Sequence, residues 1–158
     1  MKKLLCLMGL ALSLALPAAA SPVAVGQPLP TLTLQDQHGQ DWRIQPDTRL
    51  VLLAAGRTAS NTVLTVLGSQ PKGFLASQRT VYLADMSRMP GFITRSFALP
   101  ALREQPFVVG VSTQDNALSG WPTQPDSVTL LELEQQVVRA VRYAKTEAEL
   151  RAALGLAR

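Results

Sequence analysis

Three unbroken apolar runs of strand length constrain the fold more than any other feature of this chain. They lie at residues 49–55, 80–85 and 106–112, and none of them alternates polar with apolar side chains. A strand without such alternation is covered on both faces, as in the centre of an α/β sheet. The sequence therefore predicts a layered α/β domain built around a mixed central β-sheet with flanking helices.

Helical patterns separate these runs. Residues 63–67 carry a short apolar face after the first run. Either Thr58 or Ser60 could cap that helix, because a hydroxyl oxygen accepts a hydrogen bond from a free amide two or three residues on. After the second run, Pro90 suits the first turn of another helix, which Pro100 interrupts.

Patterns at the two ends of the chain complete the predicted order. Residues 31–44 and residues 128–143 each read as a β-hairpin, with alternating flanks around a short turn. One helical turn is predicted at residues 115–121. Thr146 and Glu149 form a capping box, which predicts that a last helix starts there.

The N-terminus has the features of a cleavable signal peptide. Two lysines precede an apolar stretch at residues 4–16, and small residues occupy positions 18 and 20. We therefore predict a signal peptide at residues 1–20, a single domain at residues 21–158, and export to the periplasm. An uncleaved anchor is the alternative, although 13 apolar residues are too few to span a bilayer comfortably. After cleavage no stable membrane anchor is expected.

The chain has a single cysteine, Cys6, which lies inside the predicted leader. The residues before it do not resemble a lipoprotein signal, so lipidation is not expected. After cleavage the protein would lack a thiol for a disulfide, a thiolate nucleophile or a sulfenic acid. Its stability would then depend on the hydrophobic core alone.

Charge gives little support for nucleic-acid binding. Of the 15 Lys and Arg residues, two lie in the predicted leader, which leaves 13 against 11 acidic side chains. They are spread from Arg43 to Arg158 without a run, whereas nucleic-acid-binding proteins usually cluster them on one face. We expect solvated surface arginines and no nucleic-acid partner.

Short motifs along residues 25–154 resemble a known superfamily. They are VGQPLP at residues 25–30, LxDxxG at 34–39, AGRT at 55–58 followed by Ser60, FVV at 107–109, residues 117–121, and TEAEL at 146–150. In this order they resemble the thioredoxin-like superfamily, with an N-terminal hairpin of the peroxiredoxin type. Within it they are similar to the YtfJ-like family of periplasmic proteins. The resemblance implies a thioredoxin-like fold and a periplasmic location, but no defined activity.

The resemblance also draws attention to the loop after the first central strand, which normally carries a Cys-x-x-Cys pair in thioredoxin-type proteins. Here residues 56–61 read GRTASN. Depending on register, the two cysteine positions fall at Thr58 and Asn61 or at Ala59 and Thr62. None of these side chains can carry electrons, so no catalytic residue is predicted.

The same loop is the candidate binding site. Free amides at a helix N-terminus attract anions, and Arg57 stands beside them with Thr58 and Ser60. The resemblance implies a facing cis-proline, either Pro122 or Pro125, and we prefer Pro125 because it is closer to the final hairpin. A plain helix start with a surface arginine explains the same residues without a ligand.

Other chemistries have little support in the sequence. His38 is the only histidine and falls in the predicted hairpin turn, so neither a catalytic triad nor a zinc site is expected. No G-x-G-x-x-G motif or P-loop occurs, and no cofactor is predicted. Trp42 and Trp121 fit a binding surface and a buried core equally well.

These observations favour an exported, cysteine-free domain that acts as a non-redox binding or accessory module. Its expected partner is a periplasmic protein or a small anionic ligand. The alternative is an enzyme with a non-thiol site or a bound cofactor, for example a flavin-linked oxidoreductase. A third possibility is a structural protein of the envelope that binds no ligand.

Overall fold

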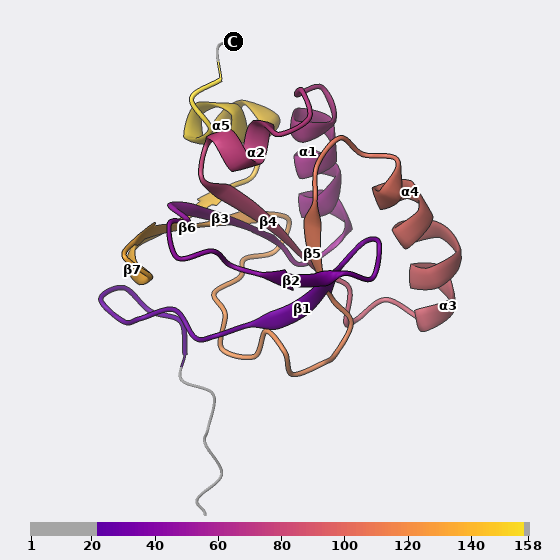
Figure 1. Ribbon diagram of the computed structural model, residues 1–158, viewed down its shortest axis with the longest axis horizontal. Helices are drawn as coiled ribbons and strands as arrows, with labels where there is room; N and C mark the ends of the chain where they lie inside the picture. The colour runs from indigo at the N-terminus through magenta and orange to yellow at the C-terminus, as the bar shows by residue number, and fades with distance from the viewer. Residues whose placement is uncertain (1–21, 157–158) are drawn as a thin grey trace, which may run out of the picture.

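A computed structural model describes residues 22–156 (Figure 1). The predicted signal peptide lies outside the described residues. In chain order the elements are β1 (Thr33–Asp36), β2 (Asp41–Arg43), β3 (Leu50–Ala54), α1 (Arg57–Gly68), α2 (Phe74–Ser77), β4 (Thr80–Asp85), α3 (Gly91–Ile93), the π-helix η1 (Thr94–Ala98), α4 (Leu99–Arg103), β5 (Val109–Ser112), β6 (Val128–Glu134), β7 (Val137–Ala144) and α5 (Glu147–Ala153).

The strands form one mixed sheet of seven, in the order β2-β1-β5-β4-β3-β6-β7. The three apolar runs supply its parallel centre, because β4 pairs in parallel with both β3 and β5. The two predicted hairpins flank this centre, with β1 antiparallel to β5 and β6 antiparallel to β3. The predicted α/β fold with a mixed central sheet and flanking helices is therefore confirmed.

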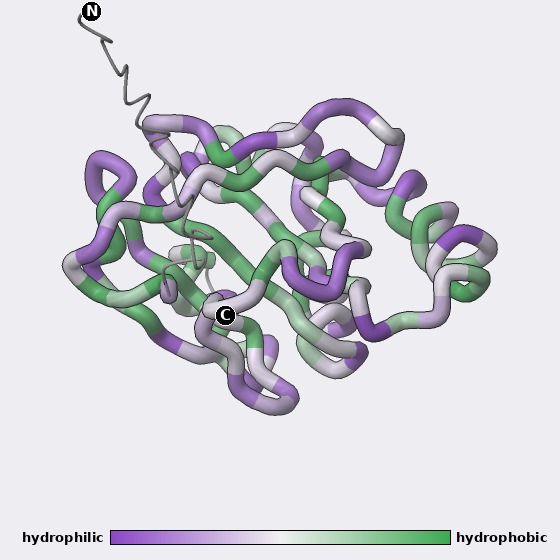
Figure 2. The backbone as a smooth tube through the Cα atoms, turned by 90° about the horizontal axis from the view of Figure 1, so that it is seen from below, coloured by the Kyte–Doolittle hydropathy of each residue, from purple (hydrophilic) through white to green (hydrophobic). Residues whose placement is uncertain are grey.

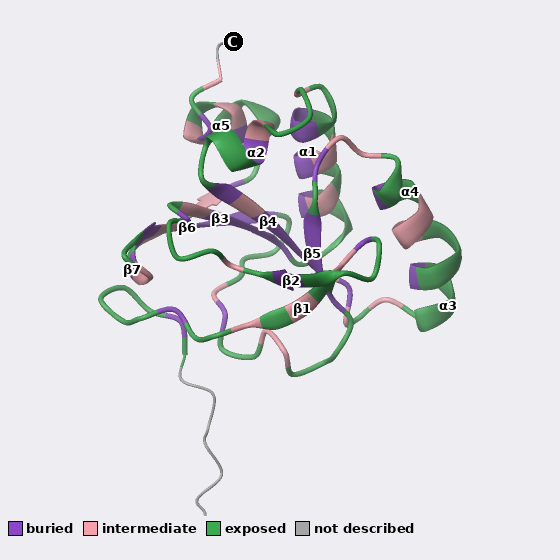
Figure 3. Ribbon diagram, viewed as in Figure 1, coloured by how far each residue is buried: buried purple, intermediate pink, exposed green. Residues whose placement is uncertain are grey.

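The helices pack on one face of the sheet. Figure 1 shows α1, α2 and α5 above the strands, and α4 beside them. Leu52, Tyr82 and Val109 line this face, and buried side chains such as Val63 of α1 and Leu150 of α5 cover it. Figure 3 shows the central strands buried between the exposed outer surfaces. This face buries every second side chain of the central strands, while Val51, Leu53 and Leu83 are buried on the opposite face, and burial on both faces removes the alternation.

The opposite face has no helical cover among the described residues. The chain before β1, the β1–β2 hairpin and the segment between β5 and β6 cover it instead, and Figure 2 shows the hydrophobic strands crossing the middle of the molecule. Trp42 and Trp121 are both buried here with Val23 and Leu29. The two tryptophans are thus core residues and do not form an exposed binding surface.

The chain before β1 is also fastened by backbone hydrogen bonds. The Val23 amide donates to the Gly120 carbonyl at 3.0 Å, and the Gly26 amide donates to the Val138 carbonyl at 2.8 Å. The Leu29 amide donates to the carbonyl of Gln136 at 2.7 Å. This first segment is therefore held against the final hairpin.

Two helical predictions need correction. Residues 115–120 form consecutive turns instead of a helical turn. The helix predicted from Pro90 is divided into α3, η1 and α4, and Pro100 lies in the first turn of α4. The backbone before Pro100 is already helical, since Ala98 and Leu99 both lie in the right-handed helical region. Pro100 therefore lies within a continuous helical segment, directly after the π-turn, and does not end it.

The last hairpin and the last helix form where their local sequences predict them. The turn between β6 and β7 has positive φ at both Gln135 and Gln136, 49° and 65°, as a two-residue hairpin of type I′ requires. The capping box is confirmed: the Thr146 hydroxyl accepts from the Glu149 amide, and the Glu149 carboxylate accepts from the Thr146 amide. Hydrogen bonds from the amides of Lys145 and Thr146 lower the pKa of Glu149.

Candidate functional site

The loop between β3 and α1 lies at the edge of the sheet where the parallel strands end. Ala54 pairs with Ala84 of β4 and with Val128 of β6, and Asp85 pairs with Ser112 of β5. The segments that adjoin these residues therefore meet at one edge. In open α/β sheets, ligands bind in the crevice at this edge.

Gly56 sets the start of α1. Its φ of 137° and ψ of 168° lie in a region that only glycine adopts readily. No side chain caps the helix, and no acidic residue occupies its first turn. The expectation that Thr58 or Ser60 caps α1 is therefore wrong, because the cap position falls on a glycine. The first backbone amides of α1 have no side-chain acceptor.

The structure separates the residues predicted for the binding loop. Arg57 and Thr58 are exposed, whereas Ser60 is half-buried. The Ser60 amide donates to the Gly56 carbonyl at 3.0 Å, and the Ser60 hydroxyl interacts with Tyr82 in the interior. Arg57 and Thr58 are therefore available to a partner, whereas the Ser60 hydroxyl contacts the interior of the protein beneath the loop.

Tyr82 was not predicted from the sequence as part of this region. It lies in the middle of β4 and is fully buried on the helical face. Burial raises the pKa of Tyr82 from its ordinary value of 10.0 to about 12, and the hydrogen bond with Ser60 opposes that shift. The pairing of a strand tyrosine with a serine 22 positions earlier depends on tertiary structure, so no local pattern in the sequence could indicate it.

Tyr82→Phe is expected to remove a pH dependence of stability. Between pH 10 and about 12, only the unfolded chain loses the phenol proton, so the wild-type free energy of unfolding falls as pH rises. The slope is about 1.4 kcal/mol per pH unit. Urea unfolding at about pH 8 and about pH 11.5 measures it. Tyr143→Phe is the matched control, and equal effects of the two substitutions would contradict this assignment.

The prediction of a cis-proline opposite the loop is wrong for both candidates. Neither Pro122 nor Pro125 has a cis peptide bond, and none occurs elsewhere in residues 22–156. The chain enters β6 through a turn without a cis peptide bond. In this turn Asp126 has a φ of 55°, and the Ser127 hydroxyl donates to the Pro125 carbonyl at 3.1 Å. Pro125 itself is exposed. It precedes β6 and so lies at the same edge as the loop.

A buried hydroxyl lies at the same edge of the sheet. Ser112 ends β5 with no exposed surface, and its Oγ has no hydrogen-bond partner in the described part of the chain. It occupies the face opposite α1, because Gly110, two residues earlier, contacts Trp42 there. Beside it in the register, the Asp85 carboxylate accepts from the Ser87 amide at 3.0 Å.

The remaining polar candidates are structural. His38 is exposed in the β1–β2 turn, where its amide donates to the Asp36 carboxylate at 2.8 Å. Its neighbour Gln37 is buried, accepts from the Val109 amide at 3.0 Å and donates to the Phe107 carbonyl at 2.7 Å. Among residues 22–156 no group of three His, Cys, Asp or Glu side chains could hold a metal ion.

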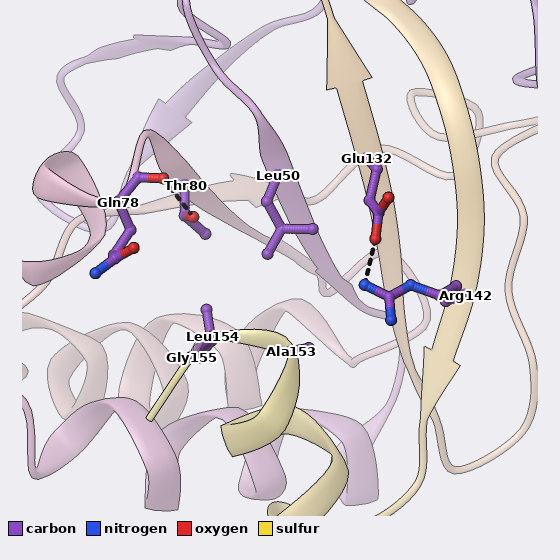
Figure 4. Close-up of a pocket in the computed structure, with 8 residues that line it drawn as sticks. All are labelled: Leu50, Gln78, Thr80, Glu132, Arg142, Ala153, Leu154 and Gly155. Atoms are coloured by element: carbon purple, nitrogen blue, oxygen red, sulfur yellow. Dashed lines mark hydrogen bonds and ion pairs between the residues drawn. The ribbon is translucent and has the colours of Figure 1, made fainter. Parts of the chain in front are cut away.

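Two cavities lie at the opposite edge of the sheet, where β3 and β4 begin. The first, of about 350 Å³, lies between the sheet and the end of α5 and contains the ion pair of Glu132 and Arg142 (Figure 4). The second, of about 500 Å³, lies beneath Trp42 and Phe107, with Lys72 and Arg79 at its wall. Neither cavity is lined by the loop that follows β3.

Solved structures of thiol-redox proteins match the fold of this chain. The peroxidoxin BcpB from Mycobacterium tuberculosis matches 83% of this chain and 94% of its own, with a TM-score of 0.55 and 14% identity. A putative thiol:disulfide interchange protein DsbE from Chlorobium tepidum matches 84% of this chain and 99% of its own, with a TM-score of 0.53 and 12% identity. The fold is thioredoxin-like. No family model matches the chain, and no curated protein is similar to it in sequence.

A putative protein disulfide isomerase from Bacteroides thetaiotaomicron has the same thioredoxin-like fold, with a TM-score of 0.52, 10% identity, and coverage of 84% of this chain and 87% of its own. At these identities the likeness concerns the fold alone. In this thioredoxin-like chain, the loop between β3 and α1 contains no sulfur. Its exposed chemistry consists of Arg57, Thr58 and the uncapped amides that begin α1.

Proposed function

We propose that this protein is an exported, non-redox binding module that acts as an accessory protein in the periplasm. It is a YtfJ-like member of the thioredoxin-like superfamily that has no Cys-x-x-Cys pair. Thiol exchange needs an attacking thiolate and a second thiol to resolve the mixed disulfide. The chain has one cysteine, Cys6, which lies in the leader that we propose is cleaved. The sulfur-free loop after β3 is the observation that carries this proposal.

The loop offers a binding surface for an anionic group. The first turn of α1 contains no acidic residue and no side-chain cap, so its amides remain available to an acceptor. Arg57 adds a guanidinium that is exposed and forms no ion pair within the described residues. A phosphate, or a carboxylate on a partner protein, complements both groups. We propose that Arg57 and Thr58 contact this partner, with Ser60 as support and Pro125 at the border.

The test uses inorganic phosphate as the probe for the loop. In nuclear magnetic resonance titrations, phosphate should shift the amide signals of residues 57–59 saturably, and Arg57→Ala should weaken binding by roughly tenfold. Arg43→Ala, an exposed arginine on β2, is the matched control and should leave the affinity unchanged. Unperturbed loop amides, or equal effects of the two substitutions, would mean that the loop is not an anion site.

A second arm addresses a protein partner and the state of the mature chain. A photo-crosslinking residue at Thr58 should capture a periplasmic protein in cells, and Arg57→Ala should reduce that capture. Native mass spectrometry of protein recovered from the cell envelope should give a chain that begins at Ser21. A bound chromophore in that spectrum would favour the alternative, a cofactor-dependent enzyme.

A further inference from the structure

Three large apolar side chains are exposed together on α3 and η1. Phe92 is 66% exposed, Ile93 39% and Phe97 61%, and we call these three residues the aromatic patch. The patch belongs to the segment that forms one end of the long axis of the molecule, labelled α3 and α4 in Figure 1. Figure 3 shows α3 as exposed. Clustered apolar side chains of this size on a surface usually mark an interaction site.

The π-helix brings the two phenylalanines together. Residues five apart in a regular α-helix point about 140° away from each other, because each residue turns the helix by about 100°. Across η1, the Leu99 amide donates to the Thr94 carbonyl five residues back, which widens the turn. The rings of Phe92 and Phe97 consequently meet edge to face, with centroids 6.1 Å apart. Single π-turns are rare and frequently occur at functional sites.

The segment of the chain that carries the patch is basic. Residues 86–103 contain three arginines and no Asp or Glu. Arg88 and Arg95 are exposed and form no ion pair within the described part of the chain. The Arg95 guanidinium folds back over Gly91, beside Phe92. Arg103 is partly engaged, because its Nε donates to the Gln37 carbonyl at 2.8 Å.

We propose that the aromatic patch binds the surface of an anionic lipid bilayer. Aromatic side chains that enter the headgroup layer beside arginines that meet lipid phosphates are the features of an interfacial segment. A second copy of this chain fits less well, because a two-fold contact would bring the arginines of both copies together. Neither described cavity borders the patch.

This binding would be peripheral. No helix within residues 22–156 is long and apolar enough to cross a bilayer. The segment from α3 to α4 would lie along the membrane surface, while the sheet and the other helices stay outside it. The inference does not depend on the anion site at Arg57, because it rests on different residues and different contacts.

The test is co-sedimentation of the mature protein with vesicles. Wild-type protein should bind vesicles of phosphatidylcholine mixed with phosphatidylglycerol, and bind pure phosphatidylcholine vesicles far less. The double substitution Phe92→Ser and Phe97→Ser should lower the affinity at least about tenfold, because it removes two apolar groups from the interface. Replacing Arg88 and Arg95 with Gln should weaken binding and reduce its sensitivity to salt.

Matched controls separate this surface from general effects. Val25 is 59% exposed and Val108 is 52% exposed, so Val25→Ser and Val108→Ser should leave vesicle binding unchanged. Phe92→Trp gives a second readout, because its emission minus that of wild-type protein, which contains Trp42 and Trp121, should shift to the blue on anionic vesicles. Failure of wild-type protein to bind anionic vesicles would overturn the proposal, and so would equal binding by the double variant. Concentration-dependent dimerisation that the double variant abolishes, without vesicle binding, would assign the patch to a second copy of the chain.

Discussion

Gly110→Ala is expected to destabilise the protein by about 3 kcal/mol or more, near the upper limit of typical overpacking. A Cβ atom at this position would lie 2.5 Å from Cε3 and 2.6 Å from Cδ2 of Trp42, well inside van der Waals contact. Neither the backbone at Gly110 nor the Trp42 ring can move easily. Gly110 pairs with Asp36 of β1 and Leu83 of β4, and Trp42 is buried against this face.

Urea unfolding followed by circular dichroism measures this effect. Gly68→Ala is the matched control, because a Cβ there meets only the flexible end of Gln105, at 3.3 Å. Gly68 ends α1, and alanine is the better helix former, so this control should be neutral or slightly stabilising. A cost below about 1 kcal/mol for Gly110→Ala would show that the Trp42 ring can move aside.

Trp42→Ala is expected to cost about 3–5 kcal/mol, as in other substitutions of large buried aromatic residues. Trp42 is 8% exposed and packs with core residues such as Leu53 and Leu83 on the face that has no helical cover. Removing the indole would leave a space that the neighbouring loops can fill only in part. The free energy of unfolding from urea titration measures the loss.

The double variant links the two predictions. With the ring removed, the Cβ of alanine at position 110 meets no tryptophan, so Gly110→Ala should cost much less in the Trp42→Ala background. Costs that simply add would show that the overpacking at Gly110 involves atoms other than the Trp42 ring. Trp121, the other buried tryptophan, provides a fluorescence signal in the Trp42→Ala variants.

Much of the fold could be predicted because its signals are local. The unbroken apolar runs became β3, β4 and β5, since the composition of a strand covered on both faces differs from that of an edge strand. The Thr146 capping box marked the start of α5, because both of its hydrogen bonds lie within four residues. The apolar flanks of the final hairpin likewise gave its position, even though its turn contains no glycine.

The candidate site was less predictable because its geometry depends on distant residues. Thr58 and Ser60 have the chemistry of helix caps, but the unusual φ of Gly56 places the cap one residue before Arg57. The side chain of Ser60 turns toward Tyr82, which the sequence does not connect with it. For Pro125 the sequence could not show that the turn at Asp126 makes a cis peptide bond unnecessary.

The exposure of the aromatic patch could not be predicted from the sequence either. Phe92 and Phe97 belong to an apolar helical pattern, and such a pattern normally predicts a buried face. The sequence cannot show that η1 shifts the phase of the helix, because π-turns have no simple composition. The exposure of both rings follows only from the arrangement of the segment outside the main core.

The fastening of residues 23–29 to the final hairpin affects when the molecule can fold. Residues near the start of the domain need Gly120, Gln136 and Val138 before their amides are satisfied, and β3 needs β6 before its second edge is paired. Contacts between such distant residues slow folding, because a long loop must close first. A chain emerging from the ribosome therefore cannot complete its core until the last hairpin has been made. That delay leaves the polypeptide incompletely folded for most of the time in which it is synthesised.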